Sequence, residues 1–438
     1  MTRIKGVILS VEGTICPNGT LDEAIFSEVD KLINYFKSKS IEYVVHTNRS
    51  WTYNKNNKLE DFLKEKWGDF SYVCYADDNT IPPKPRAESI EYILTMKKWD
   101  SLETLYIGST DDDMRTAVNG ELLFLRATWW ANATDYGFEF STPKDIARFI
   151  DTFCLRSHLW CHEIHDGAFN FYALAPFSTM KEEYTLYSQD ARNAAKHGTG
   201  HPDFWIGAIV SSLYFSGIHK QIDYVSVYPG HKAGYGNPVM DEAISIFGKC
   251  FRKNYLPDLI IRHKDAIKSQ TARNNRIAID FLNQLNTIYL NFKPMRSATR
   301  AYVRSPLGPG KTVLLIDDIT TKGYSLESGR AYIEQTGSKV ILASWLKTIN
   351  TDIDVLAPLG KFDPYVPNQF EVARVLKQHS YRQNIVDTLA PAEISAMLES
   401  YTKEGANKQV ISSQADSLIK ISRIWADFFP ANTSNQPI

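Results

Sequence analysis

Short apolar runs alternate with amphipathic windows along both halves of the chain. Runs of strand length lie at residues 5–9, 41–45, 104–107, 170–175, 222–227, 313–316 and 339–345. Between them, windows such as residues 21–36 and 87–96 carry apolar side chains at helical spacing. Strands that alternate with helices are typical of parallel sheets covered by helices, so the pattern predicts an α/β fold.

The length of the chain indicates more than one domain. A chain of 438 residues exceeds the size of one ordinary hydrophobic core. We expect two Rossmann-like parallel-sheet domains, at residues 1–164 and 165–350. Residues 351–438 then form a helical C-terminal extension, which includes helical windows at 370–378 and 391–402 and has a disordered end.

The window at residues 145–164 predicts one amphipathic helix that closes the first domain. It places Cys154, His158, Cys161 and His165 at intervals of four, three and four residues, on one helix face. Ligands spread over three turns of one helix cannot all reach one tetrahedral ion. We therefore expect these side chains to pack in the interior and not to form a four-ligand zinc site.

The balance of charges gives no global reason to expect nucleic-acid or anionic-membrane binding. Lys and Arg number 49 against 50 Asp and Glu, for a formal net charge of -1. No apolar run reaches membrane-spanning length and no secretory leader is recognisable, so we expect a cytoplasmic protein with no membrane partner. Five cysteines fit free thiols in a reducing compartment.

The stretch VLLIDDITTKGYSL, at residues 313–326, combines features that suit a sugar phosphate. An apolar strand leads into two adjacent carboxylates, Asp317 and Asp318, and then into a hydroxyl-bearing loop that opens a helix. Backbone amides at a helix N-terminus can surround a phosphate, and carboxylates can accept hydrogen bonds from vicinal ribose hydroxyls. Gly323 would let the backbone approach the ligand closely. A plainer interpretation is that the acidic pair only ends a strand and caps the next helix.

This stretch resembles the phosphoribosyl pyrophosphate (PRPP) motif of type I phosphoribosyltransferases, an apolar strand followed by Asp-Asp and a Thr-Thr-Gly-x-Thr loop. The resemblance implies that Asp317 and Asp318 are catalytic and that Mg²⁺ takes part. The residues it assigns to PRPP binding in this loop are Thr320, Thr321, Lys322, Gly323, Tyr324 and Ser325. Lys322 departs from the usual motif.

Two upstream segments complete the picture that the resemblance implies. The turn after the strand at 222–227 carries His231 and Lys232, which would hold the pyrophosphate. The chain is locally basic at residues 249–276, and this stretch is similar to the ComF-type branch of the family. It predicts either a flexible loop that closes over the pyrophosphate or a solvated helix surface. Its candidate residues are Arg262, Lys264 and Lys268. The cysteine-rich segment usual in ComF proteins is missing, and Trp345 offers a stacking surface for a base.

The N-terminal half places polar side chains after successive predicted strands. Ser10 and Glu12 precede a Gly-Thr pair, Thr47 follows the second strand, and Lys84 stands before a helix. An acidic cluster that contains Asp112 and Asp113 follows the strand at 104–107. These groups could converge on one phosphate and one metal.

This order resembles the haloacid dehalogenase (HAD) phosphohydrolases over about the first 150 residues. Active members begin with Asp-x-Asp-Gly-Thr, whose first Asp is the nucleophile and a Mg²⁺ ligand, but Ser10 and Glu12 stand here. We therefore expect no aspartyl-phosphate chemistry. The resemblance leaves Asp112 and Asp113 as metal ligands and lets Thr47 and Lys84 bind phosphate. Otherwise the domain is a scaffold or an interaction module.

Together these features predict a phosphoribosyltransferase that binds PRPP with Mg²⁺ and transfers or hydrolyses the phosphoribosyl group. The HAD-like domain would act as a scaffold or as a regulatory ligand-binding module. One alternative is a catalytically inactive regulator that binds PRPP or a nucleotide. Another is an effector of a bacterial stress or phage-defence system. The acceptor is not specified. A further helical window at 415–429 carries an apolar stripe, which we expect to pack on the two preceding domains or to contact a partner protein or a second copy of the chain.

Overall fold

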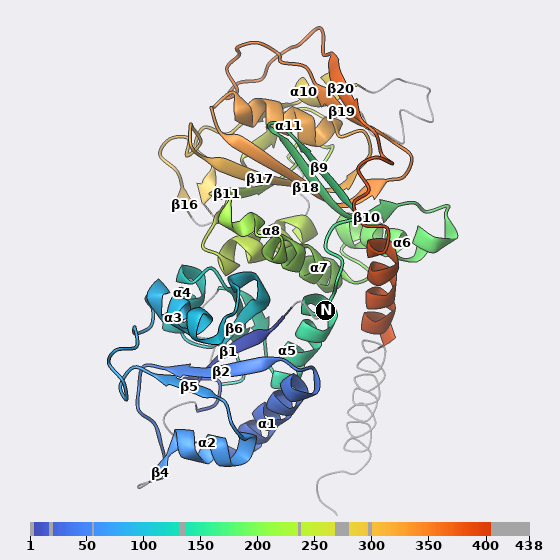
Figure 1. Cartoon of the computed structure of the whole chain (residues 1–438). Helices are drawn as coiled ribbons and strands as arrows, with labels where there is room; N and C mark the ends of the chain where they lie inside the picture. The colour runs from blue at the N-terminus through green and yellow to red at the C-terminus, as the bar shows by residue number, and fades with distance from the viewer. Residues whose placement is uncertain are drawn as a thin grey trace, which may run out of the picture.

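The computed structural model describes residues 4–16, 21–54, 57–130, 136–234, 238–267, 280–296 and 300–403. Lys268, the predicted helix at 415–429 and the predicted disordered end at 430–438 lie outside these residues. The described chain builds two six-stranded sheets, with α7 (Pro202–Phe215) and α8 (Pro238–Cys250) between them (Figure 1).

The first sheet is parallel throughout and has the strand order β5-β2-β1-β6-β7-β8. Its strands are β1 (Gly6–Ser10), β2 (Glu42–Thr47), β5 (Ser71–Cys74), β6 (Thr104–Gly108), β7 (Leu123–Ala127) and β8 (Phe138–Phe140). Its helices are α1 (Glu23–Ser38), α2 (Leu59–Trp67), α3 (Ala87–Lys97), α4 (Asp111–Asn119) and α5 (Pro143–Phe149). Every residue of β1, β6 and β7 is buried, as expected for strands covered on both faces.

Small elements connect these strands and helices. They are β3 (Thr52–Asn54), β4 (Asn57–Lys58) and the 3₁₀ helix η1 (Ser101–Glu103). The sequence sets the start of α1, because the Asp22 side chain accepts hydrogen bonds from the amides of Ala24 and Ile25.

The second sheet is mixed and has the strand order β12-β11-β17-β18-β10-β9. Its strands are β9 (His162–Asp166), β10 (Phe169–Phe177), β11 (Tyr224–Val227), β12 (Asn254–Tyr255), β17 (Thr312–Thr320) and β18 (Lys339–Thr348). The prediction of a purely parallel second sheet is wrong, because β9 runs antiparallel to β10. The two strands form a hairpin whose two-residue turn contains Gly167 at a φ of 60°, a conformation that suits glycine.

Helices and short hairpins surround the second sheet. The helices are α6 (Glu182–His197), η3 (Ile218–Lys220), α10 (Leu282–Leu285) and α11 (Tyr324–Glu334). The hairpins are β13 (Ile260–Arg262) with β14 (Ile288–Leu290), and β15 (Met295–Arg296) with β16 (Arg300–Ala301).

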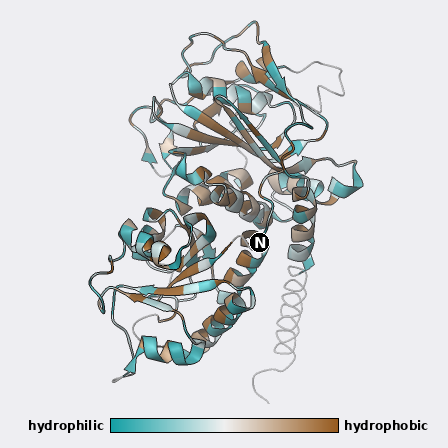
Figure 2. Cartoon of the chain, in the orientation of Figure 1, coloured by the Kyte–Doolittle hydropathy of each residue, from teal (hydrophilic) through white to brown (hydrophobic). Residues whose placement is uncertain are grey.

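Helix α7 joins the two sheets into one apolar core. All its side chains from Phe204 to Phe215 are buried. At its start Trp205 stacks on Trp345 of β18, with ring centroids 5.7 Å apart. At its other end the Tyr214 hydroxyl donates to the Thr104 carbonyl of β6, at 2.6 Å. Figure 2 shows hydrophobic residues on the strands of both sheets and on the helices between them. Trp345 is therefore a core residue and offers no stacking surface for a base.

The C-terminal part begins with strands and not with helices. β19 (Ile353–Leu356) and β20 (Val375–His379) pair antiparallel, so the predicted helix at 370–378 is wrong. The apolar strand β19 is buried against α11, and β20 completes its hydrogen bonds. A helix follows at 390–403, where the pattern predicted one, and it buries Ile394 and Leu398.

The predicted helix at 145–164 ends early. After α5 the chain forms one π-helical turn, η2 (Ile150–Cys154), and then leaves the helix. The Glu393 carboxylate accepts hydrogen bonds from the amides of Ser157 and His158, which competes with helical bonding. The cysteines and histidines of this segment therefore do not share one helix face. All five cysteine thiols are free and buried.

No helix among the described residues combines the length and the apolar character that crossing a membrane requires.

Candidate functional sites at the ends of two sheets

The first candidate site lies at the carboxyl ends of β1 and β2. It brings together Ser10 at the end of β1, Thr47 at the end of β2, Lys84 from the turn before α3 and Asp113 from the first turn of α4, with Glu12 just beyond β1. Residues far apart in sequence thus meet as the pattern predicted, because parallel strands end at one edge.

Asp113 is the deepest acidic group of this site, and its carboxylate is saturated with donors. Its Oδ2 accepts from the amides of Ser109, at 3.1 Å, and Thr110, at 3.0 Å. Its Oδ1 accepts from Lys84 Nζ, at 2.9 Å, and from the Tyr106 hydroxyl, at 3.3 Å. Burial acts to raise the pKa of Asp113, but the Lys84 ammonium and these hydrogen bonds outweigh it and hold the pKa below its usual range.

Lys84 links the two carboxylates of the site. Its ammonium lies 2.9 Å from Glu12 Oε2 and 2.9 Å from Asp113 Oδ1, and the side chain is almost fully buried. Burial acts to lower the pKa of Lys84, but Asp113 and Glu12 outweigh it and hold the pKa above its usual range. The lysine is therefore a permanent cation with two anionic partners.

The side chains of this site do not fit a magnesium ion. Asp113 already accepts four hydrogen bonds, and Glu12 accepts three. The predicted metal ligand Asp112 is exposed, because neighbouring residues of a helix point about 100° apart. Among the residues described here, no group of three acidic, histidine or cysteine side chains could hold a metal. The prediction that Asp112 and Asp113 form a metal site is wrong.

Two buried residues of this site escaped the sequence interpretation. Tyr106 on β6 contacts Asp113, and His46 on β2 lies beside Tyr106 with ring centroids 6.3 Å apart. Burial, followed by the Lys84 charge, lowers the pKa of His46 to about 3, so the imidazole is neutral. Polar residues inside otherwise apolar strands were the available signal.

The second candidate site lies where β17 ends. Asp317 and Asp318 are half-buried, and each uses one oxygen to accept a hydrogen bond from the amide of the next residue, at 2.9 and 2.7 Å. Burial and then the neighbouring carboxylate of Asp318 raise the pKa of Asp317 well above its usual range. The pair therefore favours a state with one proton or a nearby cation.

The loop after the acidic pair reaches α11 through Gly323, whose φ of 85° suits glycine. Of the predicted phosphate ligands, Thr321 and Lys322 are exposed and Ser325 is half-buried. Thr320 instead turns its hydroxyl into the protein, and the Tyr324 hydroxyl donates to Asp354 Oδ2 at 2.9 Å. These two side chains shape the loop and do not face a ligand.

Lys347 stabilises this loop through hydrogen bonds to backbone carbonyls, a role that the sequence did not predict. It pairs with Thr320 in the β17–β18 register, and its buried ammonium donates to the carbonyls of Thr321, at 2.8 Å, and Thr348, at 3.0 Å. Burial lowers the pKa of Lys347 to about 7. A lone lysine in the apolar run VILASWLKT was the signal.

The turn after β11 is fastened to a neighbouring segment. The His231 carbonyl accepts from the Ala266 amide, at 2.8 Å, and the Ala233 amide donates to Asp265 Oδ1, at 2.9 Å. Lys232 is exposed beside them. The predicted pyrophosphate turn is thus held in place by the chain that follows β13.

Arg262 is not part of a flexible loop. It lies in β13, is 4% exposed, and donates to the Gly230 carbonyl, to Thr287 and, at 2.8 Å, to Gln284 Oε1. Its position in a strand, where it donates to three acceptors, corrects the prediction. Lys264, two residues later, is exposed.

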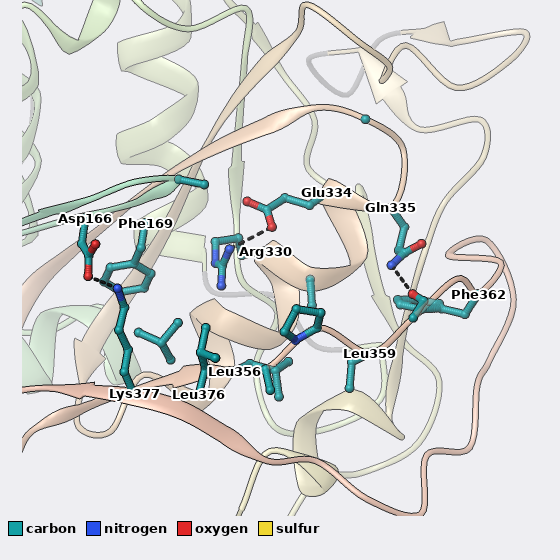
Figure 3. Close-up of a pocket in the computed structure, with 17 residues that line it drawn as sticks. Asp166, Phe169, Arg330, Glu334, Gln335, Leu356, Leu359, Phe362, Leu376 and Lys377 are labelled. Atoms are coloured by element: carbon teal, nitrogen blue, oxygen red, sulfur yellow. Dashed lines mark hydrogen bonds and ion pairs between the residues drawn. The ribbon is translucent and has the colours of Figure 1, made fainter.

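A cleft of about 500 Å³ lies apart from both sites, beside the C-terminal half of α11 (Figure 3). Its walls are mostly apolar, with Phe169, Leu356 and Phe362 among them, and the Arg330 guanidinium pairs with Glu334 in the wall. None of the predicted site residues lines it.

Comparison with known proteins agrees with the first sheet. The family model described as haloacid dehalogenase-like hydrolase matches residues 21–126. The match begins after Ser10 and Glu12 and includes Thr47, Lys84 and Asp113. The N-terminal part of the chain therefore contains a HAD-like hydrolase domain, with the Rossmann-like parallel sheet of that class.

Several solved structures are similar to a part of the chain. A HAD-superfamily hydrolase from Ehrlichia chaffeensis is 14% identical, with a TM-score of 0.27, and 34% of this chain covers 98% of that one. A HAD-superfamily hydrolase of subfamily IA from Geobacter sulfurreducens is also 14% identical, with a TM-score of 0.24 and coverages of 33% and 97%.

A protein from Lactobacillus delbrueckii, described provisionally as a phosphoglycolate phosphatase, is 16% identical with a TM-score of 0.25, and 28% of this chain covers 53% of it. No curated protein matches the chain.

Proposed function

We propose that the chain binds PRPP at the strand ends of the second sheet and transfers its phosphoribosyl group. The observation that carries the proposal is the position of two loops on adjacent parallel strands. The acidic pair lies in the last part of β17 and its loop follows the strand, the turn at 228–234 follows β11, and Val227 pairs with Ile316. Both loops leave the sheet at one edge, where open α/β sheets bind ligands.

Each part of PRPP has a suitable partner at this edge. Asp317 and Asp318 would accept hydrogen bonds from the two ribose hydroxyls, since each carboxylate keeps one oxygen without a hydrogen bond among the described residues. Thr321 and the amides at the start of α11 would hold the 5′-phosphate, with Lys322 adding charge. Lys232 would face the pyrophosphate.

The reaction breaks the bond between ribose C1 and the pyrophosphate oxygen, and the pyrophosphate leaves with the electron pair. A nitrogen nucleophile bonds to C1 and loses its proton to solvent, or water attacks and gives ribose 5-phosphate. The positive charge that develops on the ribose lies near Asp317 and Asp318, which stabilise it.

A magnesium ion bound with PRPP would neutralise the leaving group. The oxygens of Asp317 and Asp318 that accept no amide hydrogen bond are suitable ligands. Two carboxylates cannot supply the six oxygens that Mg²⁺ takes, so these residues would hold the ion together with the phosphates and water.

The test is incubation of the full chain with PRPP, Mg²⁺ and a panel of bases, with mass spectrometry of the products. We expect nucleotide or ribose 5-phosphate together with pyrophosphate, and a loss of at least 100-fold in the Asp317→Asn, Asp318→Asn double variant. Asp203→Asn, at an exposed carboxylate in the first turn of α7, is the matched control and should keep the wild-type rate. Unchanged turnover in the double variant, or no PRPP binding at all, would contradict the proposal.

A PRPP-binding regulator without turnover is the second candidate. The observation that favours it is the first site, where the side chains of Ser10, Glu12, Thr47, Lys84 and Asp113 bond to one another in a hydrolase-type domain without its nucleophile. Saturable PRPP binding without any product would support the regulator over the transferase.

A further inference from the structure

Three hydrogen-bond donors of the first site converge on the Glu12 carboxylate. Its Oε1 accepts from Thr47 Oγ1 at 2.6 Å, and its Oε2 accepts from Ser10 Oγ at 3.0 Å and from Lys84 Nζ at 2.9 Å. The donors come from the ends of two adjacent strands and from the turn before α3. Two hydroxyls and an ammonium that point at one spot form a binding site for an anion.

Glu12 sits at the mouth of this site and Asp113 at its base. The Asp113 side chain is fully buried, and two backbone amides hold it in addition to Lys84 and Tyr106. The Glu12 side chain is 16% exposed, and within the described part of the chain its hydrogen bonds come from the three side-chain donors alone. Glu12 can therefore leave the donors by rotating its side chain toward solvent, whereas Asp113 cannot.

Charge gives Glu12 a second effect on any incoming anion. With Glu12 in place, Lys84 is shared between two carboxylates and the cluster carries one uncompensated negative charge. Without Glu12, the Lys84–Asp113 pair is neutral and its ammonium faces the vacated position. Glu12 therefore both fills the anion position and repels other anions.

We propose that Glu12 is a built-in anion that closes a phosphate site in the HAD-like domain, and that inorganic phosphate or a phosphate monoester binds there only when Glu12 is displaced. The tetrahedral oxygens of a phosphate can accept from the same three donors. Phosphate binding through Thr47 and Lys84, which the sequence predicted, thus depends on the position of Glu12.

The test compares inorganic phosphate binding to the full-length wild type, Glu12→Ala and Glu12→Asp, by calorimetry and by the shift of the thermal midpoint. Alanine removes the anion, and aspartate is one methylene too short to reach both Thr47 and Lys84. We expect at least tenfold tighter phosphate binding to Glu12→Ala than to wild type, with Glu12→Asp between them. A ligand that binds only the folded state raises the thermal midpoint, and at one ligand concentration tighter binding raises it further.

Two further variants locate the effect. Asp112→Ala removes a neighbouring exposed carboxylate, changes the net charge equally and should leave phosphate binding at the wild-type level. Adding Thr47→Val to Glu12→Ala removes one donor and should weaken the gained binding. Phosphate that binds at the second sheet does so in every variant, so the difference between variants reports on Glu12 alone.

The proposal fails if folded Glu12→Ala and Glu12→Asp bind phosphate no better than wild type, or if Asp112→Ala gains as much. If Glu12→Ala does not fold, the Glu12→Asp comparison decides alone, because a carboxylate remains beside Lys84.

Discussion

The two sheets end in acidic sites that differ in how their charge is balanced. In the first site a buried lysine lies between Glu12 and Asp113, and the hydroxyls of Ser10 and Thr47 donate to Glu12. In the second site no ion pair among the described residues joins Asp317 or Asp318 to a cation, and both side chains are half-buried beside an exposed loop. In the first site Glu12 has to give up its bonds before Lys84 can bind another anion, whereas the acidic pair of the second site stays available to a sugar, a cation or a proton.

Replacing Lys84 with Met gives the largest effect that follows from this comparison. The change leaves Asp113 buried without its cation, and breaking one partner of a buried ion pair costs about 3–5 kcal/mol. Urea unfolding should show a much lower midpoint. The control Lys31→Met removes an exposed lysine that pairs with Glu28, and it should change stability by less than about 0.5 kcal/mol. Equal effects of the two changes would mean that the first site is not held by its buried charges.

Arg262→Met should weaken the second site without touching a ligand. The variant removes the donor to the Gly230 carbonyl and to Thr287 Oγ1, and each group left unsatisfied costs about 1–3 kcal/mol, whereas Gln284 Oε1 keeps its hydrogen bond from the Tyr228 hydroxyl. We expect roughly tenfold weaker PRPP binding because the turn at 228–234 loses its support.

The exposed Lys264→Met is the control for lost positive charge near that turn. If Lys264→Met weakens binding as much as Arg262→Met does, charge near the pyrophosphate, and not the fixed turn, is what matters.

The sequence predicted where chemistry-bearing residues would gather better than it predicted what each of them does. Apolar runs followed by polar groups placed Ser10, Thr47 and Lys84 at one sheet edge, because parallel strands share an edge. The pattern could not reveal that Glu12 reaches back to all three, since side-chain direction depends on local loop geometry.

Predictions for residues of the second site were wrong for the same reason, because the pattern does not show tertiary contacts. Arg262 was predicted to lie in a flexible loop because it belongs to a basic stretch, but tertiary contacts bury it. Strands β19 and β20 were missed because their pairing joins segments about 20 residues apart, which local periodicity does not show.

Lys347 should make the stability of the second site depend on pH. Its pKa is lowered to about 7 in the folded protein, so between about pH 7 and its unfolded value the unfolded chain binds more protons. Stability should therefore rise with pH across this range, by up to about 1.4 kcal/mol per pH unit from this one group.

Unfolding of wild type and Lys347→Met at pH 7.5 and 9.5 measures this dependence. The variant loses the hydrogen bonds to the carbonyls of Thr321 and Thr348 at every pH, but it should show a flatter slope. Parallel slopes would mean that the lysine stays charged under the loop.

Gly323→Ala should give the smallest effect and the most local one. Alanine at a φ of 85° is strained by about 1–2 kcal/mol, and its Cβ would lie 3.1 Å from Ile353 Cγ2, so the loop has to shift. Because the backbone amides at the start of α11 would contact the 5′-phosphate, this shift should weaken PRPP binding several-fold. When Gly323→Ala is combined with Glu12→Ala, phosphate binding at the first site should stay unchanged. Gly308→Ala, where an added Cβ meets no atom within 4 Å, is the control. If Gly323→Ala weakened both PRPP binding at the second site and phosphate binding at the first, the two sites would be coupled through the core that α7 shares between them. The closed first site and the open second site would then be parts of one linked system.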